Sequence, residues 1–301
     1  MTYYPKTFLL LGSLFLFCAC TNRMSIDKLK DQISSKLAEQ PGNFAVAFKD
    51  LSTGEMLLLN DQDFFHAAST MKTPVMIEVY KQAAAGRFSL NDSFALKNLF
   101  SSIVDNSAFS LNAHDDSDTT LYQHLGEKYS LYNLVYDMII RSSNLATNMV
   151  IELVNAHNVT QTMRQLGADK IQVLRGVEDS KAFDKGLNNV TTANDLLVIY
   201  EKMAQGEIVD NASSQAMIKI LLNQEFNDII PARLPKDVKV AHKTGNISHV
   251  LHDSGIVFLP NGKKYVLVIL SKNLQNEANA KKAMAEVSEM IYNYVITPRE
   301  S

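Results

Sequence analysis

The chain has 301 residues, of which 46% are hydrophobic and 20% are charged. This composition is typical of a folded globular protein and excludes disordered, collagen-like and multi-span membrane classes. The net charge is −3 on 29 basic and 32 acidic residues, with no long basic cluster, so no nucleic-acid partner is expected.

The first twenty residues have the pattern of an export signal. Lys6 precedes an apolar run over residues 8–17 that is too short to span a bilayer. Residues 17–20 resemble a bacterial lipobox, in which a small residue precedes a cysteine that becomes the acylated N-terminus. We therefore expect residues 1–20 to be a lipoprotein signal peptide and Cys20 to be the lipidation site, with Cys18 as the alternative. The mature protein would then lie in the cell envelope, facing the periplasm, and contact the membrane only through its lipid anchor.

Residues 21–301 are expected to form a single catalytic domain of two lobes. Both cysteines precede this domain, which excludes a disulfide, a cysteine nucleophile and a thiolate metal site within it.

Two β-rich blocks enclose a long helical region. Apolar residues at helical spacing predict a helix over 25–40, and the alternation of Phe44, Val46 and Phe48 predicts a strand over 43–51. A short turn leads to a second strand, which completes a hairpin. This second strand is predicted at 56–59. The other predicted elements are helices at 74–85, 131–140, 145–155, 193–203 and 214–222, strands at 238–243, 255–259 and 265–270, and a helix at 277–295.

This order lacks the alternation of strands and helices that builds a parallel doubly wound sheet. It predicts an α+β fold with about five antiparallel strands flanked by the N- and C-terminal helices, and an all-helical lobe with the active site between the two. Residues 100–128 carry no chemistry that we can assign, although they could form one cleft wall. Their acidic run, Asp115, Asp116 and Asp118, is typical of a solvated loop.

Ser69 and Lys72 stand just before the predicted helix 74–85. If Ser69 opens that helix, Lys72 lies one turn on, on the same face. A serine hydroxyl needs a base to become a nucleophile, and a partly desolvated amine can take its proton. Taken alone, the pair is more typical of a helix cap and a solvated lysine.

A second polar pair, Ser142 and Asn144, follows the predicted helix 131–140. The hydroxyl could pass a proton to a leaving group, and the amide could bind Lys72 and a substrate carbonyl. Serine and asparagine are equally typical of a plain turn.

A third group, Lys243, Thr244 and Gly245, ends the predicted strand 238–243. The cation and the hydroxyl could hold a substrate carboxylate, and the glycine would let a ligand approach the backbone. A turn is again the simple alternative.

In this order the motifs SxxK, SxN and KTG are those of class A β-lactamases and penicillin-binding proteins, and the chain resembles this family of penicillin-recognising serine hydrolases over residues 25–295. The resemblance implies that Ser69 forms an acyl-enzyme, that Lys72 helps to activate it and that Ser142 protonates the departing nitrogen. The backbone N–H groups of Ser69 and Asn246 would form the oxyanion hole. It implies no metal or organic cofactor. The substrate-binding residues would be Asn144, Lys243, Thr244, Gly245 and Asn246.

Class A members also carry a glutamate that activates the hydrolytic water, and Glu178 follows Asn144 at about the expected distance. The resemblance makes Glu178 the deacylation base. The chain departs from the class A pattern at two positions, with Ala182 in place of an asparagine and Ser143 in place of an aspartate. These departures leave the hydrolytic half of the mechanism open, and an ion pair with Arg175 is the alternative role for Glu178.

Four potential zinc ligands, His242, His249, His252 and Asp253, surround the third motif. Their spacing does not fix which way they face, and we expect them to flank the cleft or lie on the surface rather than bind a metal.

The sequence therefore predicts a class A-like serine β-lactamase that hydrolyses a small β-lactam substrate. A D-alanyl-D-alanine peptidase or related cell-wall hydrolase acting on peptidoglycan peptides is one alternative, and an acylation-only penicillin-binding sensor is another. No feature indicates an oligomer, so a monomer is expected.

Overall fold

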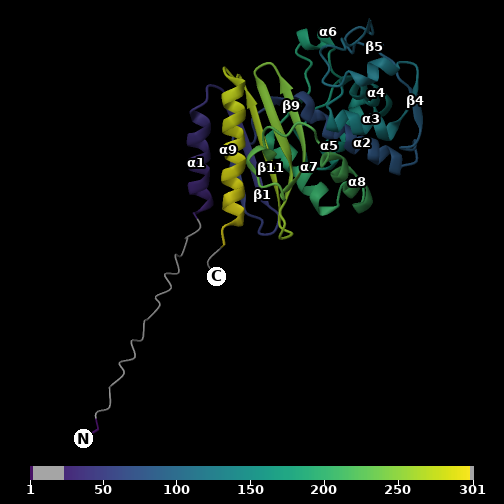
Figure 1. Ribbon diagram of the computed structural model, residues 1–301. Coiled ribbons are helices and arrows are strands. Elements are labelled where there is room, and N and C mark those ends of the chain that lie inside the picture. Colours follow the sequence, from purple (N-terminus) through teal and green to yellow (C-terminus); the bar gives the residue numbers. More distant parts are fainter. Residues whose placement is uncertain (3–23, 299–301) are drawn as a thin grey trace.

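A five-stranded antiparallel sheet in the order β2-β1-β11-β10-β9 is the frame of the fold (Figure 1). The computed structural model describes residues 1–2 and 24–298, so the predicted lipidation site at Cys20 lies outside the described residues. The strands are β1 (Asn43–Asp50), β2 (Met56–Leu59), β9 (Lys239–Ile247), β10 (Val250–Phe258) and β11 (Lys264–Lys272).

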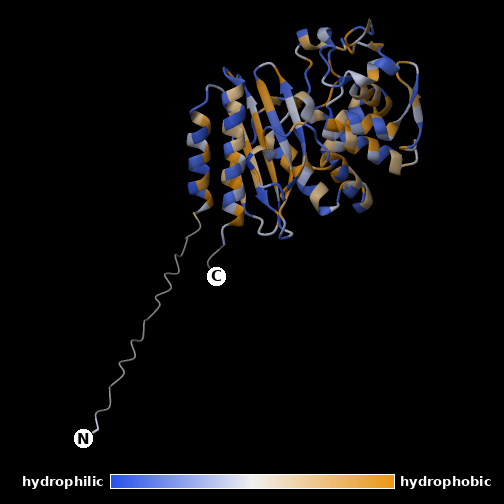
Figure 2. Ribbon diagram, in the orientation of Figure 1, coloured by the Kyte–Doolittle hydropathy of each residue, from blue (hydrophilic) through white to orange (hydrophobic). Residues whose placement is uncertain are grey.

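One face of the sheet is covered by the two terminal helices, α1 (Ile26–Ala38) and α9 (Glu277–Ile296), which lie side by side in Figure 1. The alternation in β1 explains the packing, because Phe44, Val46 and Phe48 all point into this layer. Figure 2 shows hydrophilic and hydrophobic residues interleaved along α1 and α9, as expected for amphipathic helices.

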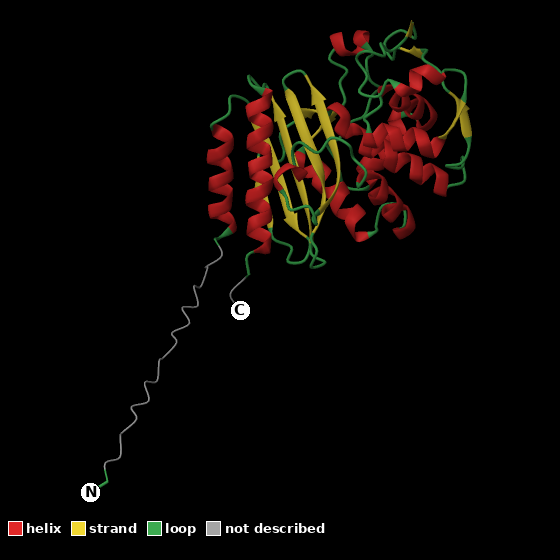
Figure 3. Ribbon diagram, viewed as in Figure 1, coloured by secondary structure: helices red, strands yellow, loops and turns green. Residues whose placement is uncertain are grey.

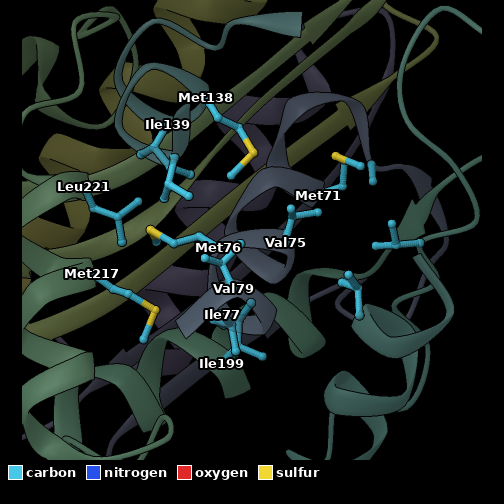
Figure 4. Packing of buried hydrophobic residues seen from close by; sticks show 14 of the residues in the cluster. Met71, Val75, Met76, Ile77, Val79, Met138, Ile139, Ile199, Met217 and Leu221 are labelled. Atoms are coloured by element: carbon cyan, nitrogen blue, oxygen red, sulfur yellow. The ribbon is translucent and has the colours of Figure 1, made fainter. Parts of the chain in front are cut away.

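The opposite face packs against α7 (Ala193–Gln205) and the helical lobe. Here the residues of β1 that face the other way, Ala45 and Ala47, are small, so α7 lies close to the sheet. Helix α2 (Lys72–Ala84) runs through the middle of the lobe, where Figure 4 shows Val75, Met76 and Val79 among side chains of the neighbouring helices. The sheet is therefore closely packed on both faces.

Figure 3 shows that helices and irregular segments form most of the second lobe. Its other elements are β3 (Phe65–His66), η1 (Ala68–Met71), β4 (Ser93–Ala95), β5 (Phe100–Ser101), β6 (Ala108–Phe109), η2 (Thr120–His124), β7 (Lys128–Ser130), α3 (Leu131–Ile140), α4 (Asn144–Val154), α5 (Ala156–Gln165), α6 (Ser180–Asp184), β8 (Val190–Thr191) and α8 (Asn211–Leu221). The short turn η3 (Pro231–Arg233) instead packs against α9.

The predicted α+β class, with its five-stranded antiparallel sheet, is confirmed, and two elements differ from their prediction. Strand β9 continues to Ile247 and turns through two residues into β10, so the third motif lies inside a strand rather than at its end. Helix α5 was not predicted. It was missed because Asn155, with φ +69°, both ends α4 and caps α5, so the two helices share one boundary residue.

The solvated-loop prediction was wrong for two residues of the acidic run, because Asp116 and Asp118 are buried. Among the described residues, the structure has no helix long and apolar enough to cross a bilayer.

Candidate active site

Ser69 lies on a strained turn at the start of the central helix. It belongs to the 3-10 turn η1, and α2 begins three residues later at Lys72. The residue before it, Ala68, has φ +44°, a left-handed conformation that non-glycine residues rarely adopt. Strain of this kind is concentrated at functional sites, where the surrounding structure holds it in place.

The Lys72 amine is fully buried and is held by the second motif. Its Nζ donates to the Ser142 carbonyl oxygen at 2.7 Å, to Ser142 Oγ at 3.1 Å and to Asn144 Oδ1 at 3.0 Å. Burial lowers the pKa of Lys72 from 10.5 to about 7, and the charges of Asp116 and Glu178 oppose that lowering. A large fraction of this amine is therefore neutral near pH 7 and able to accept a proton.

Ser142 lies between two buried amines. Lys243 Nζ donates to Ser142 Oγ at 3.1 Å, the same distance as Lys72 Nζ. Burial, together with the neighbouring Lys72, holds the pKa of Lys243 well below its usual value. Ser142 itself has φ +59°, so the turn that presents its hydroxyl is also strained. A proton on either amine is within one hydrogen bond of this hydroxyl.

The third motif lies on β9, the last strand of the sheet, which pairs with β10 on one side only. We expected Gly245 to make room for a ligand, and the structure shows a different constraint. A Cβ at this position would lie 3.2 Å from both Ala68 Cβ and Thr70 Cγ2. The glycine thus lets the strand pack closely against the turn that carries Ser69.

Glu178 faces the same site from the loop that follows α5. Asn144 Nδ2 donates to Glu178 Oε1 at 2.7 Å, so one amide side chain bridges Glu178 and Lys72. Partial burial raises the pKa of Glu178, and the Asn144 hydrogen bond opposes the rise. With φ +61°, Glu178 is the third strained residue at the site. A carboxylate on this side of the cleft could accept a proton from a water.

The backbone next to Glu178 is fixed by Asn148 of α4, a residue that was not predicted from the sequence. Its Oδ1 accepts from Val177 N at 2.7 Å, and its Nδ2 donates to Val177 O at 3.0 Å. A Cβ on Gly176 would lie 2.2 Å from Asn148 Oδ1, so only glycine fits there. The sequence signal was the glycine two residues before Glu178.

The alternative role for Glu178, an ion pair with Arg175, was wrong. The Arg175 guanidinium donates to Leu187 O at 2.9 Å, Gly176 O at 3.0 Å and Asn188 Oδ1 at 3.1 Å. The Arg175 side chain therefore holds the loop together, mainly by binding carbonyl oxygens of the loop backbone, and leaves Glu178 available to the cleft.

Two hollows meet at Ser69. One has a volume of about 280 Å³ and is bordered by Ser142, Thr244 and Gly245, and the other has a volume of about 530 Å³ and is bordered by Glu178. The residues common to both are Ser69, Asn144 and Asn246. A substrate bound across the edge of β9 would contact Ser142 on one side of Ser69 and Glu178 on the other.

The histidines near the third motif each have a separate partner. His242 Nδ1 lies 2.8 Å from Asp253 Oδ1, His252 Nε2 lies 2.8 Å from the His66 carbonyl, and His249 Nδ1 lies 2.7 Å from the Leu274 carbonyl. Within residues 1–2 and 24–298, no three His, Cys, Asp or Glu side chains are grouped so that they could hold a metal ion.

The chain is similar to known proteins over most of its length. A model of the beta-lactamase enzyme family matches residues 28–295. Beta-lactamase VEB-1 of Pseudomonas aeruginosa is 20% identical over 98% of this chain and 99% of its own length, and Beta-lactamase BRO-1 of Moraxella catarrhalis is 20% identical over 97% and 98%. The solved structure of PBP-A is 27% identical, with a TM-score of 0.78 over 91% of this chain and 98% of its own. The beta-lactamase from Sphaerobacter thermophilus shares the fold, with 23% identity and a TM-score of 0.77 over 91% of this chain and 100% of its own.

Proposed function

Because the chain belongs to the beta-lactamase enzyme family and is a serine hydrolase, we propose that it hydrolyses the cyclic amide of β-lactams through an acyl-enzyme on Ser69. The observation that carries the proposal is the contact of Ser142 Oγ with both Lys72 and Lys243, next to Ser69. This arrangement supplies a base for the nucleophile and an acid for the leaving group within one hydrogen-bond network.

In acylation, Ser69 Oγ attacks the amide carbonyl carbon while its proton passes to the neutral Lys72 amine. The oxyanion that forms is stabilised by the backbone N–H groups of Ser69 and Asn246. As the C–N bond breaks, Ser142 Oγ gives its proton to the departing nitrogen and recovers one from Lys72, whose Nζ lies 3.1 Å away. The product is an ester on Ser69, with Lys72 neutral again.

Substrate binding would use the opposite side of Ser142. Thr244 on β9 lines the smaller hollow, and Lys243, the residue before it, lies buried with its Nζ on Ser142 Oγ. The hydroxyl and the charge behind it would suit a substrate carboxylate. Asn144 would donate to the carbonyl of the substrate's side chain from the other wall.

In deacylation, Glu178 would take a proton from a water that attacks the ester carbonyl, and the ester C–O bond would break with return of a proton to Ser69. Asn144 holds Glu178 Oε1 at 2.7 Å. Ala182, in the short helix after Glu178, is fully buried and has no polar side-chain atom to hold that water. The rate of deacylation thus depends on Glu178 and Asn144.

The test is hydrolysis of a chromogenic cephalosporin by protein that lacks residues 1–20, with the intact mass measured in parallel. We expect many turnovers and a transient adduct, both lost in Ser69→Ala. In Glu178→Gln the adduct should form and persist. Equal adduct lifetimes in the unmutated protein and Glu178→Gln would reject Glu178 as the hydrolytic base.

A second candidate is an acylation-only protein or a cell-wall peptidase. It is favoured by the 27% identity to PBP-A, of which a point mutant was solved as an acyl-enzyme complex with penicillin G, and by the apolar Ala182. A stoichiometric adduct without turnover would support this candidate. Release of D-alanine from a peptide ending in D-alanyl-D-alanine would identify the peptidase.

We also propose that the protein is exported and lipid-anchored at Cys20, which is supported by Lys6, the apolar run over 8–17 and the lipobox-like residues 17–20. Incorporation of labelled palmitate should be lost in Cys20→Ser and retained in Cys18→Ser. Loss only in Cys18→Ser would assign the anchor to the other cysteine.

A further inference from the structure

The segment over residues 100–128 lies against the turn that carries the second motif. Ser117 Oγ donates to the Arg141 carbonyl at 2.8 Å, and the next contacts come from Asp116. The sequence assigned no chemistry to this segment, yet one of its carboxylates is buried at the N-terminus of α4.

Asp116 accepts hydrogen bonds from the first residues of α4. Asn144 N lies 2.9 Å from each Asp116 oxygen, and Leu145 N lies 3.0 Å from Oδ2. Tyr122 Oη donates to Oδ2 at 2.8 Å, and Asp118 N donates to Oδ1 at 3.1 Å. Every partner is a donor, so a carboxylate satisfies all of them and an amide would not.

The helix itself provides only part of this cap. Ser143 Oγ accepts from Ala146 N at 3.3 Å and leaves the N–H groups of Asn144 and Leu145 for Asp116. Helix N-termini favour negative charge, and here that charge comes from a segment 28 residues earlier in the chain.

We propose that Asp116 is the positioning residue of the second motif, whose carboxylate holds Asn144 so that its side chain binds Lys72 and Glu178 at once. The inference rests on the proposed function of this site. Asn144 Oδ1 lies 3.0 Å from Lys72 Nζ and Nδ2 lies 2.7 Å from Glu178 Oε1, so a small rotation of the first turn of α4 disturbs both contacts.

The Asp116 charge acts on the same two groups. It raises the pKa of Lys72 against the lowering by burial, and it adds to the rise in the pKa of Glu178. The acylation rate should fall on the acidic side of its pH profile as Lys72 becomes protonated, and we call this fall the acid limb. Removing the Asp116 charge should therefore move the acid limb to lower pH. A purely structural role would lower the rate without moving this limb.

The test measures the second-order rate of labelling by a fluorescent penicillin as a function of pH. Asp116→Asn places amide hydrogens against N–H groups, and we expect the labelling rate to fall on the order of 10- to 100-fold, together with the shift of the acid limb.

Adding Ser143→Asp to Asp116→Asn should recover most of the rate, because an aspartate at the N-cap of α4 returns a carboxylate to the same helix terminus. Tyr122→Phe removes a single donor to Asp116 and should slow labelling severalfold.

Asp105→Asn is the matched control. Asp105 belongs to the same segment but binds Lys181 and Ser107 on the surface. The labelling rate and the pH profile of Asp105→Asn should therefore be those of the unmutated protein. The inference would be overturned if folded Asp116→Asn kept the labelling rate and the acid limb of the unmutated protein. It would also be overturned if Asp116→Asn lost no more of the labelling rate than Asp105→Asn. If Asp116→Asn does not fold, an unchanged rate in Tyr122→Phe overturns it. Absence of labelling in the unmutated protein would instead overturn the proposed function.

Discussion

Acylation should depend steeply on pH, because the proposed base is a buried lysine. With a pKa of about 7, the Lys72 amine is about one-half neutral at pH 7, about one-tenth at pH 6 and about one-hundredth at pH 5. A lysine at the ordinary value of 10.5 would be neutral in about one molecule in 3,000 at pH 7. Burial thus increases the amount of free base at neutral pH by about a thousandfold.

Stopped-flow labelling of Ser69 by a fluorescent penicillin at subsaturating concentration reports the free enzyme, so its pH profile reports the pKa of the base. We expect the rate to fall about tenfold per pH unit below pH 6 and to level off above pH 8. In Glu178→Gln the acid limb should lie at lower pH, because the Glu178 charge raises the pKa of Lys72.

Three results would refute this reasoning. A rate independent of pH between 5 and 9 would mean that no group titrating in that range activates Ser69. A limb near pH 10 would mean that Lys72 is not desolvated. Loss of labelling in folded Glu178→Gln would transfer the role of acylation base to Glu178.

Three further predictions concern packing and stability. Gly176→Ala should slow deacylation about tenfold or more and spare acylation, measured by single-turnover kinetics, because the new Cβ would meet Asn148 Oδ1 at 2.2 Å. Tyr265→Phe should raise the free energy of unfolding by about 1 kcal/mol, since its buried hydroxyl has no hydrogen-bond partner among the described residues, whereas Tyr200→Phe should lower it by about 1 kcal/mol. Lys72→Met should be inactive, and the stability of the unmutated protein relative to that of Lys72→Met should rise between pH 7 and pH 10 in denaturant titrations, because the unfolded chain binds more protons at Lys72 there.

The sheet and its covering helices were predictable because their signals are local. Alternation in β1 and helical spacing in α1 are set by which residues face the core, and both elements lie within a few residues of their predicted bounds. The extent of β9 was not predictable in the same way. Its last residues include Thr244 and Asn246, which are polar and typical of a turn. They are held in the sheet by pairing with β10.

The motif residues were predictable, but the groups that hold them were not. Ser69, Lys72, Ser142 and Lys243 follow recognisable spacings, and the structure brings them together. Asp116 gave no such signal, because an aspartate in an acidic run is usually solvated and its partners are backbone N–H groups of a helix distant in sequence. Backbone contacts leave no pattern in side-chain identity.

The same features that suit the site for acylation cost folding free energy. Ala68, Ser142 and Glu178 have positive φ, and the buried Lys72 and Lys243 have lowered pKa values. Between about pH 7 and 10.5 the unfolded chain binds more protons at Lys72 than the folded chain, so stability rises with pH there, and below pH 7 the whole cost is present.

This cost must be offset by parts of the fold that do no chemistry. The layer between the sheet and the helices α1 and α9 is the clearest source, because it buries Phe48, Tyr265 and Ile291 and contains none of the site residues. Phe44, Val46 and Phe48 point to that layer, while the small side chains of β1 point to the layer that carries the cleft. The alternation in one strand thus separates the stabilising layer from the catalytic one, and substitutions that improve packing beneath α1 and α9 can raise stability without touching Lys72.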